Sequence, residues 1–182
     1  MILRLLIIFY CLLFVSNSNA NNKEKIINNL KIINTLSFKF EQNIEGKIEN
    51  GNCIIEYPKK MHCSYEKNNK VLVSNGKSLV IKTLSSYYRY PLKNTPLNLI
   101  LDKNFLIEKI SNLNEQNIDH TYIYYTIIED KNEIDIFFDT KTFDLVGWKT
   151  KDVYQNTTST FLYSILKNIE IKKKLFNLPF QD

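Results

Sequence analysis

The chain has 182 residues, with 24 lysines and arginines against 19 aspartates and glutamates, and a formal net charge of +5. Most of the basic residues are lysines, dispersed among asparagine and isoleucine. This pattern is typical of a solvated surface and argues against nucleic-acid binding. Because there are only 4 glycines, asparagine is expected to fill several left-handed turn positions.

The first 20 residues predict a cleaved signal peptide. A short basic start ending at Arg4 precedes an apolar core from Leu5 to Val15, and Ser18-Asn19-Ala20 supplies the small residues that signal peptidase requires. A retained membrane anchor is the alternative. Cleavage removes Arg4 and no acidic residue, so it lowers the net charge from +5 to +4. Residues 21–182 are long enough for one domain with a sizeable core.

Residues 21–36 predict an amphipathic helix. Ile26, Leu30 and Ile33 follow helical spacing, and lysine, asparagine and glutamate lie between them. The helix is expected to cover a sheet, because the rest of the chain is dominated by residues that favour strands.

After Ser37 the sequence is typical of antiparallel hairpins. Turn signals recur, mostly every 8 to 14 residues, at Gly46, Gly51, 67–69, Asn75-Gly76, Ser85-Ser86, 130–132 and 139–141. Apolar residues alternate from Phe161 to Ile171, which predicts one long strand that must curve as in a barrel wall. The stretch from Pro91 to Leu101 predicts a short helix inserted into the sheet, with Pro96 near its start. The predicted fold class is therefore mainly β with a few helices.

Two cysteines, Cys53 and Cys63, lie on the first strong hairpin, on either side of Pro58. Their odd positions place both on one face. A turn centred on Pro58 would pair them directly and allow a disulfide, whereas a loop over residues 58–60 would leave them as diagonal neighbours and free thiols. The spacing does not choose between the two registers, although two buried free thiols are the expected state.

Residues suited to catalysis or metal binding are sparse. The only histidines, His62 and His120, lie on separate predicted strands, and His62 faces away from the cysteines. No nucleophile elbow, phosphate loop or zinc helix is present in the sequence. Asp135 and Asp139 alternate with apolar residues, as expected on the solvent-exposed face of a strand. We expect a protein that is not an enzyme and has no cofactor.

Several ordered segments together resemble a known family. They are Phe38-Lys-Phe-Glu-Gln42, Tyr57-Pro58 with Tyr65, Leu72 to Leu79, Asn94-Thr-Pro-Leu97, Val146-Gly-Trp148 and Phe176-Asn-Leu-Pro179. In order and spacing the chain resembles the periplasmic outer-membrane lipoprotein carriers of the LolA family. The resemblance implies an open (half) antiparallel β-barrel, capped by the N-terminal helix and the short inserted helix.

By this resemblance, the protein is a periplasmic monomer that carries acylated lipoproteins. It would accept them from an inner-membrane ABC-type release complex and deliver them to the outer membrane, either through an outer-membrane acceptor or without one. A periplasmic lipid-binding or lipoprotein-sensing protein with the same half-barrel is the alternative. A third reading is an inert domain whose helices fill the concave face permanently.

An apolar cavity for acyl chains is expected on the concave face of the sheet. Strand alternation in the first hairpin, together with the resemblance, assigns eight residues to it: Phe38, Phe40, Tyr57, Met61, Tyr65 and Trp148 from the sheet, and Leu97 and Ile100 from the helical lid.

One position departs from the family pattern. Well-known members have arginine immediately before the proline of the first hairpin, and this chain has Tyr57. A phenol forms hydrogen bonds but holds no charge. The lid is therefore expected to be held mainly by apolar contacts, with loading that depends little on salt.

Overall fold

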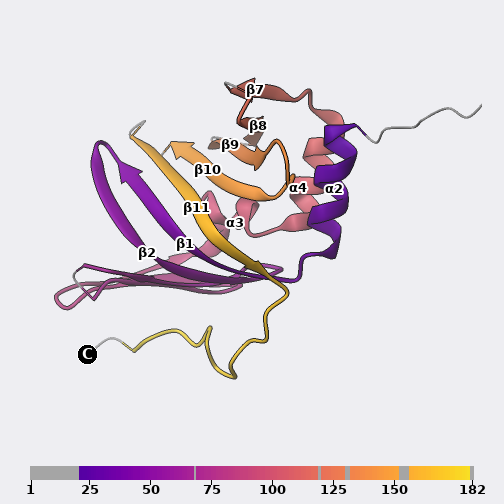
Figure 1. The fold of residues 1–182 in the computed structure, drawn as a ribbon. Helices are drawn as coiled ribbons and strands as arrows, with labels where there is room; N and C mark the ends of the chain where they lie inside the picture. Colours follow the sequence, from indigo (N-terminus) through magenta and orange to yellow (C-terminus); the bar gives the residue numbers. More distant parts are fainter. Residues whose placement is uncertain (1–20, 68, 119, 130–131, 152–155, 181–182) are drawn as a thin grey trace, which may run out of the picture.

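The computed structural model describes residues 21–67, 69–118, 120–129, 132–151 and 156–180. The predicted signal peptide lies outside these residues. All the strands of the described residues form one 11-stranded antiparallel sheet, in the order β6-β5-β4-β3-β2-β1-β11-β10-β9-β8-β7. Figure 1 shows that this sheet curves strongly and that α2 and α4 lie together at one side. The two edge strands, β6 and β7, do not pair with each other, so the barrel is open. The predicted fold class is therefore confirmed.

The elements of the described residues run as follows: α2 Asn22–Ile32, β1 Thr35–Ile44, β2 Lys47–Glu56, β3 Lys60–Tyr65, β4 Val71–Asn75, β5 Ser78–Lys82, β6 Tyr87–Pro91, the 3-10 helix η1 Leu92–Asn94, α3 Leu97–Ile100, α4 Lys103–Asn112, β7 Gln116–Ile118, β8 Tyr122–Glu129, β9 Asn132–Asp139, β10 Leu145–Lys151 and β11 Thr157–Lys167.

The N-terminal helix is shorter than predicted. The side chain of Asn21 caps its start by accepting a hydrogen bond from the Glu24 amide at 2.9 Å, and Ile26 and Leu30 are buried. The helix ends at Ile32, because Ile33 is already extended and β1 begins at Thr35. Leu36, the last residue of the predicted helix, lies in β1 instead and is buried there.

Most of the predicted turns are confirmed, but Gly51 is not a turn residue. The turns at Gly46, Asn75-Gly76, Ser85-Ser86 and 139–141 separate strands, and those at 67–69 and 130–132 include positions outside the described residues. Gly51 lies inside β2. A Cβ there would collide with the Ser64 carbonyl oxygen and would lie 2.7 Å from the Phe40 ring. The glycine therefore allows the close approach of β3 and the ring, and we expect larger residues to disrupt both.

The helical insertion is longer than the sequence analysis predicted. The short helix near Leu97 is confirmed as α3, but α4 follows it directly. Asp102 caps α4 by accepting a hydrogen bond from the Phe105 amide at 3.2 Å, and Leu106 and Ile110 are buried. Lys23 in α2 donates to the Ser111 carbonyl at 3.4 Å, and Lys103 in α4 donates to the Ile33 carbonyl at 2.7 Å. The two helices therefore form one cover.

The last strand ends earlier than predicted. β11 stops at Lys167, so Ile169 and Ile171 belong to the segment that follows it. Asn168 has a φ of 55°, and its side chain accepts a hydrogen bond from the Asn34 amide at 2.8 Å. This left-handed residue ends the strand and turns the chain away.

The two faces of the sheet differ. The concave face forms the main core with the helices. On the convex side, the segment after β11 crosses the β3–β6 region (Figure 1): Lys60 lies over the Phe176 ring, and Lys82 donates to the Phe180 carbonyl at 2.9 Å. Within the described residues, no helix is long and apolar enough to span a membrane.

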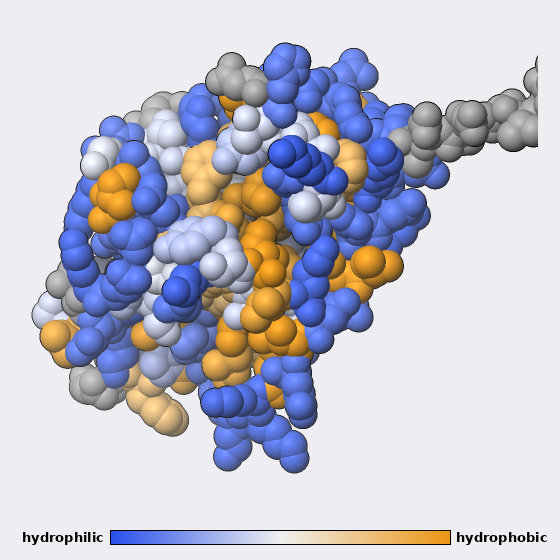
Figure 2. Space-filling view, in the orientation of Figure 1, coloured by the Kyte–Doolittle hydropathy of each residue, from blue (hydrophilic) through white to orange (hydrophobic). Residues whose placement is uncertain are grey.

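A convex aromatic cluster lies over β8–β11. Its ring-to-ring contacts run from Tyr124 to Phe137, Phe161 and Tyr122, and Phe137 stacks on Phe161 at 5.4 Å between centroids. Leu166, further along β11, is 60% exposed. Figure 2 shows a hydrophobic band over this part of the molecule, bordered by hydrophilic surface. The chain therefore has a second apolar surface, outside the core.

Candidate functional site

The eight residues predicted to line a cavity come together in one apolar cluster on the concave face. Six are buried and two, Tyr65 and Leu97, are partly buried against the others. Alternation along the strands explains the grouping, because Phe38 pairs with Cys53 and Cys53 pairs with Cys63 across three neighbouring strands. Phe38 contacts Trp148 edge-on at 6.4 Å, which joins the two halves of the sheet. The concave face is thus one continuous apolar wall.

This wall is filled by the protein's own side chains. Phe40, Ile100 and Met61 are at most 3% exposed, although Ile100 comes from the helical cover and the other two from the sheet. The clefts described below lie outside the cluster. The structure is therefore a closed form, in which any ligand of this face must displace α3 and α4 from it.

One end of the wall has a polar rim. The Tyr65 hydroxyl donates to the Gln42 side chain at 3.1 Å, and Gln42 donates to Thr160 at 3.0 Å. Burial, with an added contribution from the charge of Glu49, raises the pKa of Tyr65. The phenol therefore stays a neutral donor near neutral pH. Neither Gln42 nor Thr160 was predicted as part of the site. The parity that Gln42 shares with Phe38 and Phe40 was the only signal.

Tyr57, at the opposite end of β2, is the departure from the family pattern. Its side chain is 8% exposed, and its amide donates to the Asn34 carbonyl at 2.9 Å. Its hydroxyl is fully buried, with no hydrogen-bond partner among the described residues. Leaving a buried hydroxyl without a partner costs about 1–3 kcal/mol. Burial raises the pKa of Tyr57, so the group is a neutral phenol at every physiological pH.

The cover is fixed to the Tyr57 turn through Lys59. The Lys59 amide donates to the Leu101 carbonyl at 2.8 Å, and the Lys59 ammonium lies 3.3 Å from Asp102. The adjacent Lys103 donates to the Ile33 carbonyl. An ion pair therefore adds to the apolar contacts that were expected to hold the lid. A charge is present in this turn, two residues beyond the position where the family has arginine.

The two cysteines form a disulfide, so the expectation of free thiols is wrong. The turn comprises residues 57–59, and Glu56 pairs with Lys60 across it, which places Cys53 opposite Cys63. Both cysteines are buried in the concave cluster. The bond joins β2 and β3 next to the turn that contacts the cover.

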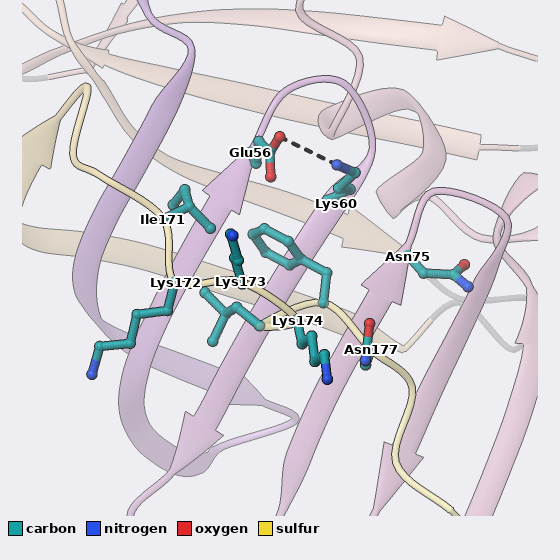
Figure 3. Close-up of a pocket in the computed structure, with 10 residues that line it drawn as sticks. Glu56, Lys60, Asn75, Ile171, Lys172, Lys173, Lys174 and Asn177 are labelled. Atoms are coloured by element: carbon teal, nitrogen blue, oxygen red, sulfur yellow. Dashed lines mark hydrogen bonds and ion pairs between the residues drawn. The ribbon is translucent and has the colours of Figure 1, made fainter.

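The clefts outside the cluster are formed by the C-terminal segment. One, of about 420 Å³, lies between residues 171–177 and the side chains of Glu56, Lys60 and Asn75, and Figure 3 shows the Glu56–Lys60 ion pair at its edge. Another, of about 570 Å³, lies between residues 178–180 and Tyr87 and Arg89. None of the eight predicted cavity residues lines either cleft.

The histidines and carboxylates of the described residues do not gather into a catalytic or metal-binding centre. Burial lowers the pKa of His62, which lies on the strand face opposite Cys63. Within the described residues, no three histidine, cysteine, aspartate or glutamate side chains are placed to hold a metal ion. The carboxylate of Asp135 lies 2.8 Å from the Thr126 hydroxyl, and Asp139 accepts amides in its own turn, which lowers its pKa.

An open antiparallel sheet with an apolar concave face beneath helices is a half-barrel. The chain belongs to the family of the outer membrane lipoprotein carrier protein LolA, whose model matches residues 31–179. No curated protein matches the sequence significantly.

The solved structures that are similar to this chain include three of low sequence identity. A LolA superfamily protein from Nitrosomonas europaea is 9% identical, with a TM-score of 0.45, over 87% of this chain and 99% of that one. A putative outer membrane lipoprotein-sorting protein domain from Vibrio parahaemolyticus is 10% identical, with a TM-score of 0.45, over 86% and 97%. LprF from Mycobacterium bovis is 10% identical, with a TM-score of 0.43, over 84% and 96%.

Proposed function

We propose that this protein is a periplasmic carrier, not an enzyme, that binds the acyl chains of lipoproteins released from the inner membrane and delivers them to the outer membrane. The observation that carries the proposal is the family match over residues 31–179. The continuous apolar wall beneath α3 and α4 supports it, since acyl chains need such a surface.

The energetics of an acyl chain in water explain why a carrier is needed. Each exposed methylene is unfavourable by about 0.8 kcal/mol, so a diffusing lipoprotein with several acyl chains has a penalty of roughly tens of kcal/mol. A carrier must replace water around these chains and still release them.

The closed concave face suits reversible binding. Acyl chains would displace Leu97 and Ile100 from the wall, and on release the same side chains would cover it again. Since one apolar contact replaces another, loading and release differ little in free energy and need no nucleotide hydrolysis by the carrier. The donor would be an inner-membrane ABC-type release complex, and the acceptor an outer-membrane receptor.

A second candidate is a periplasmic lipid-binding or lipoprotein-sensing protein. Tyr57 favours it, because the arginine of well-known carriers is replaced by a group without charge. This candidate predicts free lipid in the purified protein, whereas a carrier prefers an acylated peptide.

Native mass spectrometry tests the proposal. Purified protein is mixed with a triacylated lipopeptide, with the same peptide without acyl chains, or with phospholipid. We expect a one-to-one complex with the lipopeptide and none with the bare peptide. Preference for phospholipid would support the second candidate, and binding of neither would reject both.

A matched pair of variants locates the ligand. Leu97→Gln changes a partly buried residue of the cover, and Phe180→Gln changes a residue that is 88% exposed. We expect only Leu97→Gln to weaken lipopeptide binding. Equal effects would place the ligand elsewhere.

A further inference from the structure

The Tyr57 hydroxyl is a buried hydrogen-bond donor that the described protein does not satisfy. It lies in the apolar cluster with Ile55 and Met61, and no acceptor among the described residues reaches it. A buried polar group in a native structure nearly always has a partner. A donor left unpaired on the wall of a binding face therefore indicates a ligand that supplies an acceptor.

A second buried hydroxyl, that of Tyr125, is also without a hydrogen-bond partner among the described residues, but its surroundings differ. Burial raises the pKa of Tyr125 to about 12, and the charge of Glu115 contributes to the rise. Tyr125 lies on β8 and packs edge-on against Phe138 at 6.1 Å between centroids, whereas Tyr57 adjoins the turn whose Lys59 amide contacts the cover at Leu101. Of the two phenols, Tyr57 is therefore the one beside the cover that a ligand of the concave face would displace.

The chemistry of the site selects a neutral acceptor. A phenol that remains protonated offers its proton to an oxygen, and an ester carbonyl at the head of an acyl chain is an uncharged oxygen acceptor. A free carboxylate would need a cation, and the nearest one in sequence, Lys59, is already paired with Asp102 at 3.3 Å. Fatty acids are thus disfavoured relative to esters.

We propose that the Tyr57 hydroxyl binds an ester carbonyl of the lipid, so that this protein selects ester-linked acyl chains over ether-linked alkyl chains and free fatty acids. The inference rests on the proposed acyl-binding function and specifies its ligand. Tyr57 would then recognise the linkage, while the surrounding wall binds the hydrocarbon.

The test compares two lipopeptides that differ only in linkage, one with two ester-linked acyl chains and one with two ether-linked alkyl chains of equal length. Each displaces a fluorescent apolar probe from the purified protein. A single neutral hydrogen bond predicts that the wild type prefers the ester about fivefold, which corresponds to about 1 kcal/mol. Tyr57→Phe removes only the hydroxyl and should bring the ratio to about one.

Tyr125→Phe is the matched control, because it removes the other unpaired hydroxyl. We expect it to keep the wild-type ratio. A wild type that binds both lipopeptides equally, or a Tyr57→Phe variant that still prefers the ester, would overturn the inference and leave the carrier proposal intact. If neither lipopeptide displaces the probe, the proposed function itself fails and this inference fails with it.

Discussion

The ion pair between Lys59 and Asp102 should control how readily the cover opens. Asp102→Asn removes the charge, and it can keep the helix cap because one oxygen still faces the Phe105 amide. The side chains are 34% and 27% exposed, so solvent screens the pair and its contribution is about 0.2–1 kcal/mol. In the variant, the closed form should be less stable than the open form by that additional amount. The population of open molecules should therefore rise by up to about fivefold.

The assay is the rate at which purified protein binds a fluorescent lipopeptide, measured at low and high salt. We expect Asp102→Asn and Lys59→Gln each to load faster at low salt, and the double variant to load no faster than either. The difference should shrink near 1 M salt, where the screening length is about 3 Å.

Glu133→Gln is the control, because it removes the ion pair with Lys151, which lies on β9 and β10 away from the turn and the cover. It should leave loading unchanged. Loading by Asp102→Asn at the wild-type rate in low salt, or an equal effect of Glu133→Gln, would refute the role of the Lys59–Asp102 pair.

Three further predictions follow from the site. Tyr57→Arg buries a charge without a described partner, so it should lower the melting temperature before any gain in transfer, and a variant that is as stable as wild type and transfers faster would contradict this. Reduction of the Cys53–Cys63 bond, which closes a short loop, should lower the free energy of unfolding by about 2–3 kcal/mol; equal denaturation curves with and without reductant would show that the bond contributes little. Depletion of the protein should leave outer-membrane lipoproteins in the inner membrane, and normal placement after fractionation would reject the carrier role.

Much of the sheet could be predicted because alternation is local. Met61 was assigned to the apolar face from its position in the first hairpin, and Phe38 and Trp148 were assigned with the help of the family resemblance. All three belong to the concave cluster. Hairpin turns at Gly46 and Asn75-Gly76 were readable from residue type, since both glycines have positive φ.

What failed depends on contacts distant in sequence. Asp102, Leu106 and Ile110 have the spacing of a capped helix, but the predicted insertion ended at Leu101, so α4 was missed. Gly51 was interpreted as a turn residue because the sequence does not show that Phe40 and Ser64, from the neighbouring strands, pack closely against it. The cysteine register depended on whether Lys60 belonged to the turn or the strand, a difference of one residue.

The contact between the cover and the Tyr57 turn could not be predicted from the sequence, for the same reason. Lys59 matters because it pairs with Asp102, which is more than 40 positions later in the sequence. Nothing in the sequence around Lys59 indicates this partner. The unpaired hydroxyl of Tyr57 likewise appears only when every neighbour is placed.

The central claim is that acyl chains bind on the concave face beneath the helices. A lipopeptide with a photoreactive group near the end of an acyl chain, cross-linked to the purified protein and mapped by mass spectrometry, tests it most directly. The chain offers two apolar surfaces that distinguish the outcomes. We predict adducts on Phe40, Met61 and Ile100, and adducts confined to the convex aromatic cluster at Tyr122 and Phe161 would contradict the claim.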